Sequence, residues 1–412
     1  MVICLKLANM SSPKFHKQKS RLGPLSLHQH PSQRHSPLRN STSLPKMAGI
    51  PNLNTLKRGG PRLRGSRRGG RAIPENDDDG LLSPAQQEAA KDRVVQQTDG
   101  DASSSRLSAV ALRYLDDAYA REFLQPGEQI PRRYPIINRG TYVRSTAIDL
   151  LVKRFLAAEP AGRRQIISLG AGSDTRCLRL CFGAGEVVYH ELDFETNVTA
   201  KRAALERSST LSHRLREVKG TGCEYHLHAV DLRDLATDSP PNLPGIDWTL
   251  PTLILSECCL CYLPPDQASG VLKYFMFRLT RSAGLIIYEP IRPFDAFGKT
   301  MVTNLASRGI HMQTLKRYSS VEAQRQRLRL AGFSDGQGAR DVHQIWESEA
   351  WVAVSERERV ERLEWLDEVE EWKLLASHYC VAWGWKGEVF GKAWSGLEGG
   401  RTRDEDRDDE VG

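Results

Sequence analysis

The sequence predicts an α/β fold built on a doubly wound, mostly parallel sheet. Five short apolar runs alternate with segments of helical periodicity, which is the pattern of repeated strand–helix–strand units. The first run ends in glycine and each of the next three ends in or near an acidic residue. Ligands of such sheets bind beyond the carboxyl ends of the strands, so these residues predict the position of the functional site.

Two helices are expected before the first strand. Apolar residues at helical spacing predict a helix over 101–124, with Asp101 or a nearby serine as N-cap. A second helix is predicted over about 142–158. A loop with three prolines separates the two: Pro126, Pro131 and Pro135.

The strands of the predicted sheet are short and apolar. Their ranges are Gln165–Gly170, Glu186–Asp193, Glu224–Leu232, Pro251–Glu257 and Ala283–Glu289. Pro264 and Pro265 open a helix that runs to about Leu279.

After Pro293 the periodicity is helical again. Ser319 and Glu322 have capping-box spacing for a helix that Gly332 ends. One acidic amphipathic helix is predicted over 361–375, followed by a last strand over Ser377–Lys386.

The charge distribution divides the chain into three parts. The net charge is +7, but residues 1–73 carry 15 Lys and Arg and no acid, which leaves 43 basic and 51 acidic residues and a net charge of −8 beyond them. We expect residues 1–97 to be a disordered basic extension rich in Ser, Pro, Arg and Gly, 98–390 to be the catalytic domain, and 391–412 to be a charged, disordered tail. The acidic domain argues against a nucleic-acid-binding core.

The basic extension admits several interpretations. Its RGG-like stretch Lys57–Arg71 suits weak RNA contacts or arginine methylation, and equally a solvated tail. Its first 45 residues resemble a transit peptide in composition, but prolines interrupt any amphipathic helix. Synthesis could also start at Met10 or Met47. No run is long and apolar enough to predict a membrane span, and the 8 cysteines predict reduced, buried thiols with no metal site.

The residues at the strand ends predict a nucleoside-binding pocket. Gly170 and Gly172 allow close approach of a ligand to the backbone, although Thr175 stands where the third glycine of a dinucleotide motif would be. Asp193 lies 21 residues after Gly172, which is the spacing of an acid that binds a ribose diol.

Three further residues extend this pocket. Asp231 could accept from an adenine amine with Leu232 against the ring, and Glu257 would face a cationic ligand end. Each acid alone could be a helix cap or a solvated loop residue. Together they favour a positively charged nucleoside, S-adenosylmethionine, over NAD.

Several separated motifs resemble the leucine carboxyl methyltransferase family. They are LGAGSDTR, HELDF, AVDLRDL, LILSECCLCYLPPDQASGVLKYF and YEPIRPFDAFGKTMVTNL. The resemblance implies a Rossmann-like methyltransferase sheet with added N-terminal helices and a lid or insert region. It implies methyl transfer from S-adenosylmethionine to the C-terminal leucine α-carboxylate of the protein phosphatase 2A catalytic subunit.

The resemblance also implies cofactor-binding residues. It adds Arg106, where the family has lysine, and Arg144 of the NRG-x-x-x-R segment to Gly170, Asp193, Asp231, Leu232 and Glu257. Tyr262 is a candidate for the peptide groove. A terminal carboxylate has a pKa near ~3.5 and is ionised at neutral pH, so no general base is required and no catalytic residue is assigned. His190 and His226 fall within strands, where a role in the core or on the face of the sheet is expected instead of catalysis.

Two alternatives remain open at this point. One is another S-adenosylmethionine-dependent O-methyltransferase; the tRNA-modifying branch carries a long repeat domain for which this chain leaves no room. The other is a non-catalytic, RNA-associated interaction protein. We expect a monomer without a stable nucleic-acid partner or membrane attachment, located in the cytoplasm and, as an alternative, also in the nucleus.

Overall fold

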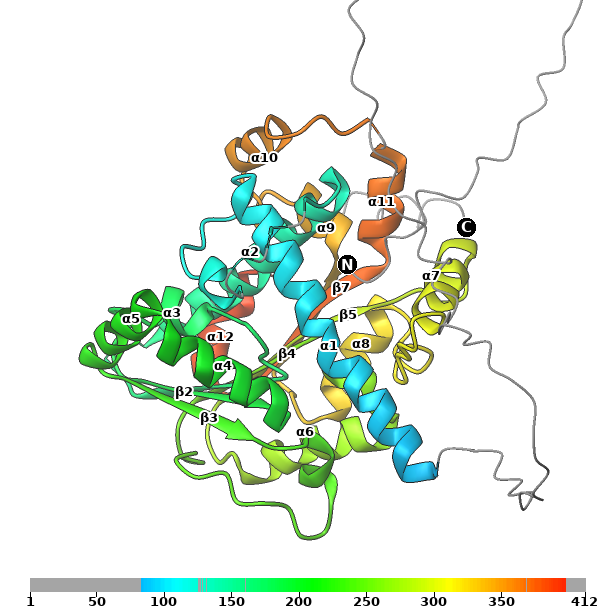
Figure 1. Ribbon diagram of the computed structural model, residues 1–412. Helices are drawn as coiled ribbons and strands as arrows, with labels where there is room; N and C mark the ends of the chain where they lie inside the picture. The colour runs from blue at the N-terminus through cyan, green and yellow to red at the C-terminus, as the bar shows by residue number, and fades with distance from the viewer. Residues whose placement is uncertain are drawn as a thin grey trace, which may run out of the picture. The chain divides into compact units, whose positions relative to one another are not determined.

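A seven-stranded sheet organises the chain and confirms the predicted α/β class (Figure 1). The computed structural model describes residues 83–397 except 125, 126, 128, 131, 160 and 368. The strand order is β3-β2-β1-β4-β5-β7-β6. The strands are β1 (Arg164–Leu169), β2 (Val187–Asp193), β3 (Cys223–Ala229), β4 (Thr252–Glu257), β5 (Ala283–Pro290), β6 (Gly336–Asp341) and β7 (Tyr379–Lys386).

The direction of the strands explains where a ligand can bind. Strands β1 to β5 pair in parallel, whereas β7 runs antiparallel to both β5 and β6. The chain winds outward from β1 to β3 and then returns to β4 beside β1. The carboxyl ends of β1 and β4 therefore flank the switch point, where open α/β sheets have their binding crevice.

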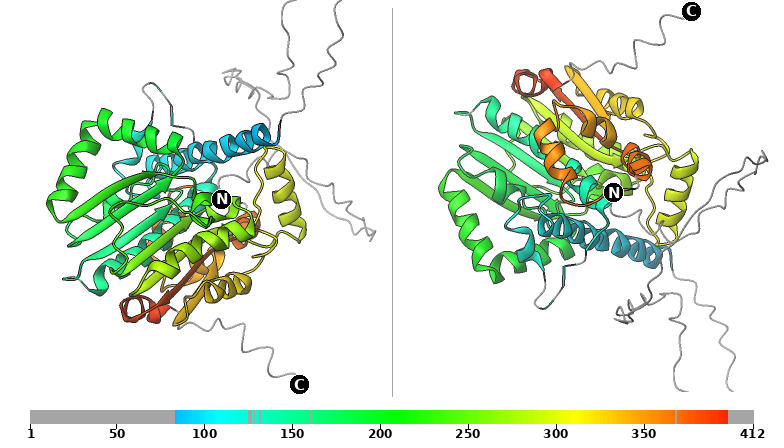
Figure 2. Two further views of the ribbon diagram at one scale, coloured as in Figure 1. Left: turned by 90° about the horizontal axis from the view of Figure 1, so that it is seen from below. Right: turned by 90° about the horizontal axis from the view of Figure 1, so that it is seen from above.

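Helices cover both faces of the sheet, as Figure 2 shows. They are α1 (Pro84–Ala111), α2 (Pro135–Ala158), α3 (Arg176–Leu180), α4 (Glu195–Arg207), α5 (Ser209–Gly220), α6 (Pro265–Arg278), α7 (Ala296–Ala306), α8 (Val321–Leu330), α9 (Val342–Glu347), α10 (Val354–Glu361), α11 (Val369–Ser377) and α12 (Glu388–Trp394). Because side chains alternate along a strand, Ile166 joins a core with α2, α9 and α12, while Ile167 joins a core with α6 and α8. Among the described helices, none is both long and apolar enough to cross a membrane.

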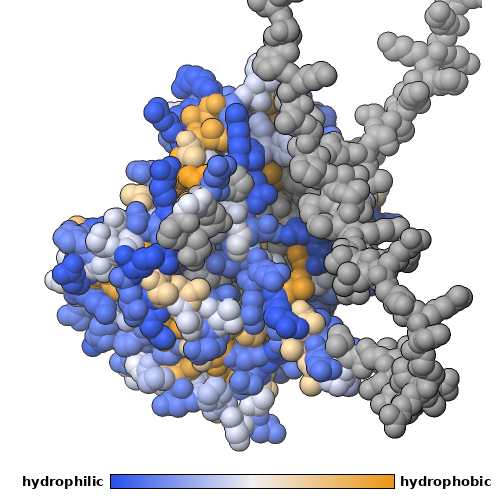
Figure 3. Space-filling view, in the orientation of Figure 1, coloured by the Kyte–Doolittle hydropathy of each residue, from blue (hydrophilic) through white to orange (hydrophobic). Residues whose placement is uncertain are grey.

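The N-terminal boundary predicted at residue 98 is wrong, because residues 84–97 are helical. Ser83 caps α1 and forms a capping box with Gln86, and Pro84 occupies the first turn. The polar composition of this stretch resembles that of a disordered segment. The molecular face seen in Figure 1 is likewise mostly hydrophilic (Figure 3). Ion pairs, which leave no apolar periodicity, connect this part of α1 to the rest of the domain through Arg233.

The C-terminal boundary at residue 390 is also too early. Helix α12 continues to Trp394, and a 3-10 turn, η7, runs over Ser395–Leu397. The indole of Trp394 is fully buried, and its Nε1 donates to the carbonyl of Leu151 in α2 at 3.0 Å. The domain therefore extends through Leu397, and the expected tail beyond it lies outside the described residues.

Strand β6 was not predicted because its sequence, GQGARD, has no apolar alternation. An added Cβ at Gly336 would lie 2.1 Å from an indole carbon of Trp385, and one at Gly338 would lie 2.2 Å from an indole carbon of Trp383. The two glycines therefore leave room for the tryptophans of the neighbouring strand. The apolar cover over β6, the last strand of the sheet, therefore comes from the tryptophans of β7 and not from side chains of β6 itself.

The single amphipathic helix predicted over 361–375 is wrong. Helix α10 ends at Glu361 and α11 begins at Val369, with Trp365 between them 86% exposed. The carboxylate of Glu364 accepts from the side chains of Arg132 and Asn138, which holds this segment outside a helix. The cap of α8 also shifts by one residue, since Ser320 rather than Ser319 accepts from the backbone of Ala323.

Candidate functional site

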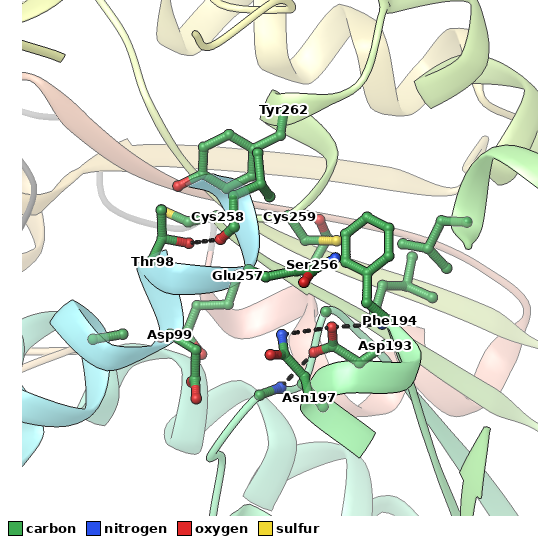
Figure 4. Close-up of a pocket in the computed structure, with 18 of the residues that line it drawn as sticks. Thr98, Asp99, Asp193, Phe194, Asn197, Ser256, Glu257, Cys258, Cys259 and Tyr262 are labelled. Carbon is green, nitrogen blue, oxygen red and sulfur yellow. Dashed lines mark hydrogen bonds between the residues drawn. The ribbon is translucent and has the colours of Figure 1, made fainter. Parts of the chain in front are cut away.

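One pocket opens at the carboxyl ends of β1, β2 and β4, at the predicted switch point (Figure 4). Helix α1 forms one wall with residues from Glu88 to Arg106, and α2 contributes Arg144. All seven residues named from the sequence lie in the wall of this pocket: Arg106, Arg144, Gly170, Asp193, Asp231, Leu232 and Glu257. Tyr262, the candidate groove residue, lines it as well.

The turn after β1 requires glycine for both space and conformation. Gly170 and Gly172 have φ angles of 61° and 46°, in the left-handed region that favours glycine. A Cβ on Gly170 would lie 2.7 Å from the Sγ of Cys259, and a Cβ on Gly172 would lie 2.2 Å from Asp99. Asp99 of α1 accepts from both the backbone nitrogen and the hydroxyl of Ser173, so α1 holds this turn from outside.

Asp193 connects the end of β2 to the glycine turn. Its Oδ2 accepts from the backbone of Gly172 at 2.7 Å, and its Oδ1 accepts from the backbone of Phe194 and the side chain of Asn197. Burial raises the pKa of the Asp193 carboxyl, and these three hydrogen bonds oppose that effect. A carboxylate can accept about four hydrogen bonds, so Oδ2 keeps one acceptor position for a ligand hydroxyl.

Asp231 does not end a strand as expected, because β3 stops at Ala229. It is the N-cap of a 3-10 turn, η5, over Leu232–Ala236. Its carboxylate accepts from the backbone and the guanidinium of Arg233. Arg233 also donates to Asp92 at 2.6 Å and to Glu88 at 3.1 Å, both on α1. Arg233 thus joins the predicted adenine side of the pocket to the N-terminal helix, while Leu232 packs into the core below.

Glu257 contacts two arginines instead of solvent. Its Oε1 accepts from Nε of Arg144 and its Oε2 accepts from Nη1 of Arg176 at 2.6 Å. Burial alone would raise the pKa of Glu257, but the two guanidinium groups outweigh burial and hold it below its usual range. Glu257 was expected to face the cationic end of a ligand, and the protein itself already supplies two cations beside it.

Arg144 retains donors that none of the described residues uses. Its guanidinium lies 4.8 Å from the centre of the Tyr288 ring, and Nε is taken by Glu257. Within the described ranges, no hydrogen bond is present at either terminal nitrogen of Arg144. These two nitrogens match the two oxygens of a carboxylate.

Arg106 reaches the pocket from α1. Its Nη1 donates to Asp117 at 3.1 Å, and Asp117 also accepts from Thr175 at 2.6 Å. This buried acid fixes one nitrogen of Arg106 and ties α1 to the turn before α3. Arginine therefore fits a position where the family pattern has lysine.

Arg176 was part of a quoted motif but was not singled out from the sequence. It is 1% exposed and donates to Asp149 at 2.7 Å and to Asp174 at 2.9 Å, besides Glu257. Its Nη2 is buried without a hydrogen-bond partner among the residues the structure describes. A cation in the first turn of a helix opposes the helix dipole, and this was the signal in the sequence that could have identified it.

The histidines differ in their position relative to the pocket. His190 is fully buried, bonded to Gln165 and His228, and like His226 it does not line the pocket, as expected. His311, which was not considered from the sequence, is exposed and lies at the pocket.

The pocket residues fit a nucleoside that carries a carboxylate. The glycine turn and Asp193 offer close backbone approach and one free acceptor position. Among the described residues, Nη2 of Arg176 and the hydroxyl of Thr141 have no hydrogen-bond partner, although both atoms are buried and both residues contribute to the same wall.

The chain is similar in sequence to leucine carboxyl methyltransferases. A family model described as leucine carboxyl methyltransferase matches residues 94–276. A leucine carboxyl methyltransferase 1 of Emericella nidulans is 52% identical over 386 residues, which cover 85% of this chain and 97% of that protein. Another, of Yarrowia lipolytica, is 43% identical over 326 residues, which cover 71% of this chain and 97% of that protein. A solved structure of an O-methyltransferase family protein from Burkholderia thailandensis is 14% identical with a TM-score of 0.37, and the match covers 67% of this chain and 62% of that one.

Proposed function

The chain belongs to the leucine carboxyl methyltransferase family, and we propose that it transfers a methyl group from S-adenosylmethionine to the C-terminal leucine α-carboxylate of the protein phosphatase 2A catalytic subunit. The family membership supports methyl transfer to a leucine carboxyl group. The phosphatase as substrate is our proposal, based on the resemblance of the motifs described above.

We assign the nucleoside part of the methyl donor to the wall formed by β1, β2 and η5. The free acceptor position of Asp193 suits a ribose hydroxyl, and the glycine turn allows the ribose to approach the backbone. The Asp231 carboxylate suits the exocyclic amine of an adenine, and Leu232 suits contact with its ring. When bound, S-adenosylmethionine supplies an electrophilic methyl group on a sulfonium.

The proposal rests mainly on the two terminal nitrogens of Arg144, which are available to bind a carboxylate. Glu257 fixes Nε of Arg144, so the rest of the guanidinium is held in one orientation without another protein partner among the described residues. A planar, prepositioned guanidinium binds carboxylates by two parallel hydrogen bonds. The methionine part of the donor and the C-terminus of a peptide both present such a carboxylate.

The residues of the pocket need only align the reactants and exclude water. A peptide carboxylate is ionised at neutral pH, so no side chain has to remove a proton. Helix α1 covers the pocket with residues from Glu88 to Arg106, which limits access of solvent. Reaction partners held in line in a dry site gain several kcal/mol over reactants in solution, about 7–11 kcal/mol in favourable cases.

Incubation with methyl-labelled S-adenosylmethionine and two substrates tests the proposal. The substrates are the phosphatase catalytic subunit and the same subunit without its terminal leucine. We expect label only in the intact subunit, in a form released by mild base, as an ester is. Label in both subunits would indicate another O-methyltransferase activity, and binding of the donor without transfer to either would contradict the proposed substrate.

A further inference from the structure

Three buried cysteines come together at the end of the sheet opposite to the pocket, and we call them the thiol cluster. Cys177 lies in α3, Cys181 is the residue that ends this helix, and Cys223 is the first residue of β3. Their Sγ atoms all lie within 4.8 Å of one another, and the residues are 1%, 0% and 2% exposed. None of them lines the pocket, which opens at the carboxyl ends of the strands, whereas Cys223 begins its strand.

Helix and strand geometry bring the thiol cluster together. Cys177 and Cys181 are four positions apart, which places both side chains on one side of a helical turn, and the nitrogen of Cys181 donates to the carbonyl of Cys177 at 3.2 Å. Cys223 follows 42 positions later and pairs in register with Val187 of β2. Gly222 has a φ of 96°, and its carbonyl accepts from the nitrogen of Val187 at 3.3 Å, which fixes the chain where β3 begins. Because this arrangement depends on strand pairing, the spacing of the cysteines in the sequence predicted no metal site.

The separation of the sulfur atoms suits a shared metal ion. Three atoms at most 4.8 Å apart have a common centre no more than about 2.8 Å from each of them, and a thiolate sulfur lies about 2.3 Å from a bound ion such as zinc. An inward shift of about 0.5 Å per sulfur therefore completes a site with three sulfur ligands. A small rotation about χ1 of each cysteine supplies a shift of this size without movement of the backbone.

The donor atoms favour a soft ion of low coordination number. Among the described residues, no carboxylate or imidazole joins the three thiols, and Val187 and Val218 belong to the same apolar core as the thiol cluster. Structural Zn(II) sites almost always have four ligands. Thiolate sulfur also selects Cu(I), which is stable with three sulfur ligands. The thiol cluster therefore fits Cu(I) better than Zn(II).

A buried hydroxyl without a partner lies on the same face of the sheet. Tyr189 follows Val187 by two positions in β2, so its side chain lies on the face shared by Val187 and its register partner Cys223. Tyr189 is 0% exposed, and its hydroxyl has no hydrogen-bond partner among the residues that the structure describes. Burial raises the pKa of this hydroxyl well above its usual value, so it keeps its proton. It is thus a donor available to a metal-bound thiolate, and hydrogen bonds of this kind orient metal ligands.

Only short surface loops separate the thiol cluster from solvent. Phe182 directly follows the second cysteine and is 48% exposed, while Gly222 and Glu224 flank the third and are exposed. The two loops meet where the nitrogen of Gly183 donates to Oγ1 of Thr221 at 3.3 Å. Local opening of surface loops costs less free energy than global unfolding, so an ion has a route to the buried thiols.

We propose that the thiol cluster of Cys177, Cys181 and Cys223 binds one Cu(I) ion, which joins α3 to the start of β3. The ion replaces thiol protons, so binding releases protons to the solvent. An ion that binds the folded chain more tightly than the unfolded chain stabilises the fold. The site does not rest on the proposed function, because no residue of the thiol cluster lines the pocket.

Anaerobic titration of the reduced full chain with Cu(I) held by bathocuproine disulfonate tests the site. We expect one ion per chain to transfer from the chelator and X-ray absorption at the copper edge to show three sulfur neighbours. The melting temperature should rise by about 5–10 °C when the free ion is a hundredfold above its dissociation constant. Cys223→Ala and Cys181→Ala should each weaken binding at least tenfold. Cys380→Ala, which removes a buried free thiol outside the cluster, should bind like the unchanged chain.

Three results would overturn the proposal. They are retention of all copper by the chelator, unchanged affinity in the folded Cys223→Ala or Cys181→Ala, and displacement of Cu(I) by an equal free concentration of Zn(II). If neither variant folds, the number of sulfur neighbours in the copper-loaded unchanged chain still decides, and a number other than three contradicts the site.

Discussion

The backbone nitrogen of Gly172 donates to Oδ2 of Asp193 at 2.7 Å, so the turn after β1 and the end of β2 share one carboxylate. The same carboxylate accepts from Phe194 and Asn197. Asp193 therefore fixes the shape of the pocket and retains only one acceptor position for a ligand. Loss of its charge should affect binding in two ways, through the ligand and through the turn.

Asp193→Ala should weaken binding of S-adenosylmethionine by about 1–3 kcal/mol, the range for a charge-assisted hydrogen bond. Isothermal titration calorimetry measures the change. Glu195→Ala, which removes an exposed acid two positions away, should bind like the unchanged chain. An unaltered dissociation constant in a folded Asp193→Ala would rule out the ribose assignment.

Arg144→Ala should lower methyl transfer by about 1.5–3 kcal/mol of barrier, the cost of losing a hydrogen bond to a charged partner. Arg144→Lys should rescue little, because an ammonium cannot occupy Nε and both terminal positions at once. Steady-state kinetics on the phosphatase subunit measure both variants. Lys153→Ala, at an exposed position of the same helix, is the control and should keep full activity. Full activity in Arg144→Lys would exclude the two parallel hydrogen bonds from Arg144 to a carboxylate.

The rate of the chemical step should be flat from about pH 6 to 8, because a peptide carboxylate with a pKa near 3.5 is ionised throughout. Single-turnover rates across this interval provide the measurement. His311→Gln should leave the profile unchanged, although His311 lies at the pocket. A tenfold rise per pH unit would mean that a base is needed and that the nucleophile is not a carboxylate.

Removal of residues 1–82 should leave donor binding intact, whereas removal of 1–97 should weaken it. The shorter deletion stops before α1, while the longer one removes Glu88 and Asp92, the partners of Arg233. Calorimetry on both truncations tests this. Asp92→Ala should lose part of the affinity that the longer deletion loses. Arg93→Ala, at an exposed position beside it, should keep the full affinity. Equal affinities of the two truncated chains would contradict a role of α1 in the pocket.

His190 should make stability fall in acid. Burial, together with the charges of His226 and His228, lowers its pKa to about 3, whereas an unfolded histidine has a pKa of about 6.5. Between these values the unfolded chain binds more protons, so the free energy of unfolding decreases as pH falls from 6.5, by up to about 1.4 kcal/mol per pH unit. Urea unfolding measures the free energy of unfolding at each pH. In His190→Gln this free energy should change less with pH between pH 4 and 6.5 than in the unchanged chain. The same pH dependence in both proteins would contradict the prediction.

The central sheet and the positions of the pocket acids could be predicted because burial determines both. Strands β1 and β2 are buried along their whole length, and each has an apolar pair at its centre or start, Ile166–Ile167 and Val187–Val188, so both strands end within one residue of the predicted bounds. Parallel strands bring their carboxyl ends to one edge, which places Gly170, Asp193 and Glu257 in one pocket.

The polar connections of the pocket could not be predicted from local patterns. Arg176 pairs with Glu257 over 81 positions, and Arg233 pairs with Asp92 over 141. Such pairs carry no periodicity and have many possible partners in a charged sequence. The start of α1 was missed for the same reason, because Glu88 and Asp92 join it to the domain through ion pairs with Arg233, and the adjacent Val94 and Val95 that pack on the core show no helical period.

Helix α1 is completed during synthesis long before the residues that hold it. At about 5–20 residues per second, Arg233 follows Asp92 by roughly 7–28 s. A short apolar helix left undocked for that time would expose a surface that promotes aggregation. The first half of α1 has Val94 and Val95 as its only large apolar residues, and its other residues are polar, alanine or proline. It therefore exposes little apolar surface to water before Arg233 is synthesised. The composition that made this segment look disordered thus suits a helix that must wait for most of its domain to be translated.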